Sequence, residues 1–271
     1  MPAIHPARLK IQVEQLVEQV YQPTVFTRGF KSLLEKYADR THRPGQSGKP
    51  PPLLHAYNVP PPVIRQVLLS LKPAIRQDPA AILALCDTLW LEPNLECRTV
   101  AASLLGQVQL SEEAVVERLH VYLSTSAELE ERNAEDRILE ALLDAGLAPV
   151  RRTNPNRILA LSKGWLDQKE IIAQQAALRA LRYLAAEPNF DNMPGIYRLI
   201  SSLLRVVPLE LRADMVDLLC VLVDRSPSEA AYILKQSLSA SENPDTPWLV
   251  RQVMSRFPEE IRLNLRKALN P

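Results

Sequence analysis

A tract of this sequence recurs after 75 residues, with position 90 matching position 165. Trp90-Leu91-Glu92 aligns with Trp165-Leu166-Asp167, and without a gap Ala101-Ala102 then falls on Ala176-Ala177. Both copies have the pattern of a helix end, an acidic corner and a second helix with small residues at its middle. The offset is two units of about 37 residues each, a length typical of two-helix repeats. Since small residues let neighbouring helices approach closely, we predict an all-α fold, a right-handed α-solenoid of stacked helical pairs.

Apolar residues recur at helical spacing along most of the chain, for example at Leu211, Met215, Leu218 and Leu222. The chain has 23 prolines and only 7 glycines, which suits helices joined at proline corners and disfavours glycine-rich phosphate loops. No alternating strand pattern of useful length is present in the sequence. The predicted helices are 7–21, 24–38, 61–75, 79–91, 95–108, 112–124, 132–145, 155–165, 168–187, 193–206, 209–224, 227–239, 246–256 and 258–269.

Charge is distributed unevenly, although the net charge is only +1. Residues 1–77 carry 11 basic and 4 acidic side chains, residues 78–150 carry 4 and 14, and residues 151–271 carry 17 and 13. The one long stretch without a helical pattern is the proline-rich segment 39–52. We therefore predict N-terminal helices and a basic loop over 1–52, followed by one continuous repeat domain over 53–271. Basic ends around an acidic centre permit a local phosphate contact without requiring one.

Histidines and cysteines do not form a metal-binding pattern in this sequence. The four histidines are scattered, and Cys86, Cys97 and Cys220 lie among helical apolar residues, which favours reduced core thiols. Neither an HExxH nor a GxSxG motif is present, and GQSGK at 45–49 lacks the preceding strand of a phosphate loop. We expect no metal and no cofactor.

No run of residues approaches the roughly 18 apolar positions of a membrane span. The N-terminus, MPAIHPARLK, lacks the apolar core of a signal peptide. We expect a soluble, cytoplasmic monomer that does not bind membranes.

Charged and aromatic residues within the repeats are the candidates for partner binding. Glu96 and Arg98 start one repeat helix, and they form either a structural ion pair or part of a groove that meets an anionic partner. Trp90 and Trp165 are either packing residues between repeats or platforms for stacking a base. The candidate binding residues are Arg65, Trp90, Glu96, Arg98, Arg151, Arg152 and Trp165.

Several segments resemble the DNA alkylation repair family. HAYNVPPPVIRQVLLSL at 55–71 resembles its tract in which an aromatic residue precedes a "GVP…P…R" helix start. LWLEPNLECRTVAASLLG at 89–106 resembles the family's "LW…E.R..A" helix, and 171–181 and 248–258 are similar to its later repeats. The resemblance implies HEAT-like repeats whose concave face binds duplex DNA.

Active members of that family, by this resemblance, excise alkylated purines without flipping the base into a pocket. A W-x-x-x-D arrangement supplies an aspartate that stabilises the sugar cation, since an oxocarbenium-like transition state needs a fixed carboxylate. In this chain the matching region is EERNAEDRILEALLDAGL, which has no tryptophan, and Asp136 is the nearest acid. Trp165 and Asp167 are two positions apart, which places them on different faces of a helix. No catalytic residue is therefore assigned.

We predict a non-catalytic HEAT-like repeat protein that binds a macromolecule, protein or duplex DNA, on its concave face. One alternative is an active alkylpurine DNA glycosylase in which Trp90, Trp165 and an acid such as Asp136 meet across the groove. Another is a binder of DNA structure that contacts phosphates through Arg65, Arg98 and Arg151-Arg152. Excision activity and salt-dependent DNA binding separate the three.

Overall fold

A computed structural model describes residues 4–39, 56–126, 132–168, 170–239 and 244–269. Within these ranges the chain is helical and contains no β-strand, which confirms the predicted all-α class. The chain divides into two compact units, Met1–Pro149 and Val150–Pro271, here called unit 1 and unit 2. The handedness of the predicted solenoid and the boundary at residue 52 stay predictions.

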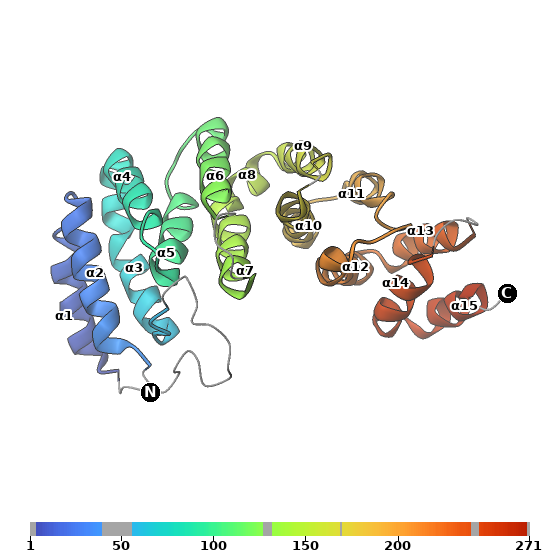
Figure 1. The fold of residues 1–271 in the computed structure, drawn as a ribbon, viewed down its shortest axis with the longest axis horizontal. Helices are drawn as coiled ribbons and strands as arrows, with labels where there is room; N and C mark the ends of the chain where they lie inside the picture. The colour runs from blue at the N-terminus through green and yellow to red at the C-terminus, as the bar shows by residue number, and fades with distance from the viewer. Residues whose placement is uncertain (1–3, 40–55, 127–131, 169, 240–243, 270–271) are drawn as a thin grey trace. The chain divides into compact units, whose positions relative to one another are not determined.

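Unit 1 consists of two layers of helices (Figure 1). The helices α1, α3, α5 and α7 lie side by side in one layer, while α2 packs on α4 in the other. A π-helical turn, η1, continues α7 and packs on α5. The bounds are α1 (Pro6–Val17), α2 (Pro23–Tyr37), α3 (Pro61–Gln77), α4 (Pro79–Trp90), α5 (Leu95–Leu105), α6 (Glu112–Ser126), α7 (Arg132–Ala141) and η1 (Leu142–Gly146).

Unit 2 continues the pairing of helices. The helices α10, α12 and α14 contact one another in order, α9 and α11 cover α10, and α13 packs on α12, α14 and α15. The bounds are α8 (Ala148–Thr153, which begins in unit 1), α9 (Pro155–Leu166), α10 (Ile171–Ala186), α11 (Met193–Ile200), η2 (Leu209–Leu211), α12 (Arg212–Arg225), α13 (Pro227–Ser239), α14 (Thr246–Val253), η3 (Met254–Arg256) and α15 (Glu259–Leu269).

Asparagine and aspartate side chains start several of these helices. The side chains of Asp78, Asn94, Asn154 and Asn192 each accept a hydrogen bond from the backbone N–H three residues later. Such a bond satisfies one of the free N–H groups of a first helical turn and stabilises the helix by about 1 kcal/mol. Three of these four caps are followed by a proline in the first turn, so a capping side chain and a proline both indicate these helix starts.

The repeated alanine pairs lie at helix contacts, as predicted. Ala101 and Ala102 on α5, and Ala176 and Ala177 on α10, are all fully buried. Each of these helices packs on the preceding helix of its own pair and on a helix of the next pair. The small side chains therefore let three helices meet closely at each repeat.

Ion pairs join successive repeats of unit 2 at a nearly constant sequence separation. Arg179 and Arg182 on α10 pair with Asp214 and Asp217 on α12, 35 residues later in each case. Arg212 at the start of α12 pairs with Asp245, 33 residues later. The separation matches one two-helix repeat, so these pairs tie each repeat to its neighbour.

Two parts of the helix prediction are wrong. The helix predicted over 193–206 ends at Ile200, and the loop that follows bonds to partners outside the helix. The backbone N–H of Val207 donates to Asp245 Oδ2 (2.8 Å), and the Thr246 hydroxyl donates to the Leu204 carbonyl (2.6 Å).

The second difference is the segment after α7, where the sequence predicted one helix as far as residue 145 and no element over 146–154. The π-helical turn η1 and the short helix α8 occupy 142–153. A Cβ on Gly106 would lie 1.8 Å from the Ala145 carbonyl oxygen, so the end of α5 touches the backbone of this turn. The turn is therefore shaped by a contact that only tertiary structure supplies.

Candidate nucleic-acid interface

The loop before α3 is held in place by Glu96, one of the predicted site residues. The Glu96 carboxylate, in the first turn of α5, accepts hydrogen bonds from the backbone N–H of Tyr57 (3.2 Å) and of Asn58 (2.8 Å). Asn58 has a φ of +52°, in the left-handed region that favours glycine and asparagine. This explains why Asn58 stands where the family tract has glycine. Glu96 thus fixes how the chain enters α3.

A groove runs along α3 beside α5. Its wider part, a cavity of about 700 Å³, is lined mainly by α3, the loop before it and the start of α5, together with Arg137 of α7. Its narrower part, about 280 Å³, is lined by Lys72, Ile75, Arg76, Pro79, Gln107 and Gln109. Lys72 and Gln107 line both parts, so the two form one continuous surface, here called the basic groove.

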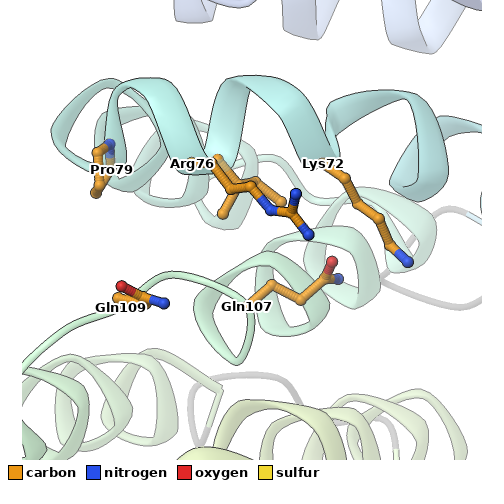
Figure 2. Close-up of a pocket in the computed structure, with 6 residues that line it drawn as sticks. Lys72, Arg76, Pro79, Gln107 and Gln109 are labelled. Carbon is orange, nitrogen blue, oxygen red and sulfur yellow. The ribbon is translucent and has the colours of Figure 1, made fainter.

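Figure 2 shows Lys72 and Arg76 pointing from α3 toward the Gln107 side chain at the end of α5. Gln109 lies on the loop that follows α5. The arrangement places cationic and amide N–H donors together on the narrower part of the groove.

Four cationic side chains line the basic groove. Arg65, Lys72 and Arg76 lie at positions i, i+7 and i+11 of α3, on one face and spread over about 16 Å of helix. Arg137 of α7 lines the wider part. All four are exposed, and none makes an ion pair with any residue that the structure describes. The single acid lining the groove, Glu96, has both oxygens bonded to backbone N–H groups.

Trp90 and Arg98 meet in a buried cluster instead of on the groove. The Trp90 ring, 2% exposed, stacks on Tyr122 at 4.3 Å between centroids, and the Arg98 guanidinium lies 5.3 Å from the Trp90 ring centre. Arg98 Nε donates to the Glu92 carbonyl (3.2 Å), so Arg98 does not form the expected pair with Glu96. Burial lowers the pKa of Arg98. These contacts are those of residues that pack one repeat on the next.

The remaining predicted site residues lie in unit 2. Arg151 is buried, with its Nε 2.7 Å from Glu187 Oε1 and its guanidinium over the Tyr183 ring. Trp165 is 4% exposed, so its ring is not open for stacking on a base. Arg152 is exposed on α8. Of the seven predicted residues, the structure thus brings Arg65 and Glu96 to the basic groove.

The other polar residues of the basic groove were missed by the sequence prediction: Asn58, Lys72, Arg76, Thr99, Gln107, Gln109 and Arg137. The spacing of Arg65, Lys72 and Arg76 on one predicted helix was a usable signal. The glutamines and Arg137 join them only through the packing of α3, α5 and α7.

Cys86 and Cys97 have the properties of core thiols, whereas Cys220 is half-buried. Burial raises the pKa of the Cys97 thiol to about 12 and also raises that of Cys86, so neither is a nucleophile at neutral pH. Across the described ranges, no group of three or more histidine, cysteine, aspartate or glutamate side chains is placed to hold a metal ion. The same residues include no helix long and apolar enough to cross a bilayer.

Comparison with protein families places most of this chain in a known family. A family model described as "DNA alkylation repair enzyme" matches residues 31–205, which is more than half of the chain and includes the whole basic groove. No significant match was found among curated proteins or among solved structures. The match supports a function related to DNA repair. The chain belongs to the DNA alkylation repair enzyme family.

Proposed function

We propose that this protein binds duplex DNA without excising bases, and that the basic groove of unit 1 holds the phosphate backbone. The observation that carries the proposal is the row of four exposed cations, Arg65, Lys72, Arg76 and Arg137, which have no carboxylate partner among the described residues. Elsewhere in the described chain most arginines that line repeat contacts are paired with acids. Unpaired cations along one groove favour a polyanionic ligand.

The groove also offers donors that could position a backbone. The amide groups of Gln107 and Gln109 lie beside Lys72 and Arg76, and amide N–H groups bond phosphate oxygens or base edges. Lysine and arginine contacts to phosphates supply most of the affinity and make it depend on salt.

Excision is not part of the proposal, for reasons of sequence and of burial. The region expected to hold the W-x-x-x-D arrangement contains no tryptophan. Trp90 and Trp165, the aromatic residues that could replace it, are buried. The side chain of Asp136 lies outside the described part of the structure, so the carboxylate must be tested directly.

Family membership keeps excision of alkylated purines as the second candidate. Release of methylated purines from alkylated DNA, abolished by Asp136→Asn, would establish it. A protein partner on the same face is the other candidate, suggested by the acidic balance of residues 78–150, which would repel DNA.

Salt-dependent titration tests the proposal. Fluorescence anisotropy with a labelled duplex, repeated at several salt concentrations, should give a steep loss of affinity as salt rises. Each groove cation removed, in Arg65→Gln, Lys72→Gln or Arg76→Gln, should lower the slope of log affinity against log salt by about 0.9. Lys36→Gln is the matched control, because Lys36 is an exposed cation of unit 1 on α2 that does not line the groove.

Two outcomes would contradict the proposal. Absence of duplex binding at low salt would remove DNA as the partner and leave the protein candidate. Equal slopes for the groove variants and Lys36→Gln would place the phosphate contacts elsewhere on the molecule.

A further inference from the structure

The wider part of the basic groove is more apolar than phosphate binding requires. Its walls include Val59, Ile64, Leu68 and Leu95, and this open part of the groove has a volume of about 700 Å³. Sites that hold small organic molecules occupy roughly 300–1,000 Å³ and have mainly apolar walls with a few polar groups. A phosphate backbone alone would leave this part of the groove, here called the apolar pocket, unfilled.

The polar groups of the apolar pocket are hydrogen-bond acceptors and cations. Glu96 is held rigidly by the two backbone N–H groups of Tyr57 and Asn58, and each of its oxygens keeps a further lone pair for another donor. The Thr99 hydroxyl donates to the Leu95 carbonyl (2.8 Å), so its oxygen is available as an acceptor. Arg65, Lys72 and Arg137 complete the lining with positive charge. A matching ligand is apolar in its body, carries N–H donors and is attached to negative charge.

We infer that the apolar pocket takes one unpaired nucleobase of a DNA strand whose phosphates lie on the basic groove. This inference rests on the proposed DNA binding and adds a structural preference to it. A base supplies a flat apolar body, and adenine, cytosine and guanine supply an exocyclic amino group that can donate to Glu96. An acyl chain with an anionic head lacks such donors and would leave the Glu96 carboxylate without a partner in the ligand. A nucleotide matches both the apolar walls, through its base, and the cations of the groove, through its phosphate.

The inference predicts a preference among DNA structures. Taking a base out of an intact duplex costs pairing and stacking energy, and the cost is least for a base that is already unpaired. The protein should therefore bind a duplex with a single bulged adenine more tightly than the intact duplex. This differs from the resemblance to active relatives, which implies excision with no base placed in a pocket.

The decisive comparison keeps the protein constant and changes only the base. Wild-type protein is titrated against three labelled duplexes: intact, with one bulged adenosine, and with one bulged abasic nucleotide. The two bulged duplexes have the same number of phosphates and the same bulge position, and they differ in the base that would enter the apolar pocket. We expect the adenine bulge to bind about tenfold more tightly than the abasic bulge, the ratio that one hydrogen bond to a carboxylate provides. A bulged thymidine, which has no exocyclic amino group, should fall between them.

A variant that fills the apolar pocket locates the effect. Leu68→Trp places a large side chain in the pocket and should abolish the preference for the adenine bulge over the abasic bulge. Ile11→Trp is the matched control, because Ile11 is an exposed apolar residue of α1 (56%) that does not line the groove. Circular dichroism of each variant confirms that the helices are retained.

The results distinguish failure of this inference from failure of the proposed function. Equal affinity of wild type for the adenine and abasic bulges overturns the inference, while salt-dependent binding of the intact duplex still supports the proposed function. A preference that persists in Leu68→Trp also overturns it, because the base would then bind elsewhere. If none of the duplexes binds at low salt, both fall.

Discussion

Replacing Arg179 by methionine should destabilise unit 2 strongly. Arg179 Nε lies 2.7 Å from Asp214 Oδ1 and a second nitrogen lies 3.4 Å from Oδ2, and the two side chains are only 8% and 9% exposed. The substitution leaves a buried carboxylate without its cation, which costs about 3–5 kcal/mol. At about 2–4 °C per kcal/mol for a chain of this size, the midpoint of thermal unfolding should fall by about 6–20 °C.

The same helix pair supplies the control. Arg182 and Asp217 join α10 to α12 less than one turn away, but Asp217 is 58% exposed and the N–O distance is 3.4 Å. Solvent screens this pair, so Arg182→Met should cost about 1 kcal/mol or less. The double variant Arg179→Met/Asp214→Leu should recover most of the loss, because both charges leave the interior together.

Calorimetry and urea unfolding of the wild type, Arg179→Met, Arg182→Met and the double variant measure these differences. The reasoning fails if Arg179→Met is no more destabilising than Arg182→Met. It fails equally if the double variant is as unstable as Arg179→Met, since the cost would then come from lost packing.

Three further predictions concern single residues. Gly106→Ala should lower stability in thermal unfolding by about 1–3 kcal/mol, because the new Cβ would collide with the Ala145 carbonyl. Gly164→Ala, where a Cβ would have nothing within 4 Å, should raise stability by about 0.5–1 kcal/mol, and equal effects of the two variants would contradict the contact at Gly106. Cys97 should resist iodoacetamide at pH 8 until the protein unfolds, and rapid labelling of the native protein, read by mass spectrometry, would refute this. The free energy of unfolding should fall as pH rises from 9 toward about 12, because over that range the unfolded thiol loses its proton while the folded thiol keeps it. Asn58→Gly should leave the free energy of urea unfolding unchanged, whereas Asn58→Val should lower it by about 1–2 kcal/mol, since a β-branched residue is strained at positive φ. Equal stability of the two variants would argue against a positive φ at this position.

Much of the fold could be predicted because its determinants are local. Helical spacing of apolar residues, prolines in the first turn and caps such as Asn154 lie within a few residues of the elements they specify. The end of α11 at Ile200 could not be predicted in this way. It depends on Asp245 and Thr246, which are about 40 residues away and provide hydrogen bonds to the loop that follows.

The site was harder to predict because burial, which separates packing from binding, is a tertiary property. Trp90 and Arg65 had equal standing as candidates in the sequence, yet Trp90 stacks on Tyr122 in the interior and Arg65 lines the basic groove. Glu96 has a role that no local pattern indicates, because its hydrogen-bond partners are 38 and 39 residues away. The residues that sequence reasoning missed become a group only when α3, α5 and α7 lie together.

The stacked Trp90 has a spectroscopic consequence. It is the only tryptophan between residues 1 and 149, while Trp165 and Trp248 both belong to unit 2. In a Trp165→Phe/Trp248→Phe protein, all indole emission would come from one ring enclosed by Tyr122 and Arg98. That emission should shift to longer wavelength when unit 1 opens to water, whatever unit 2 does. Compared with the loss of helical circular dichroism, which follows both units, this emission would report whether the two units melt together or in sequence.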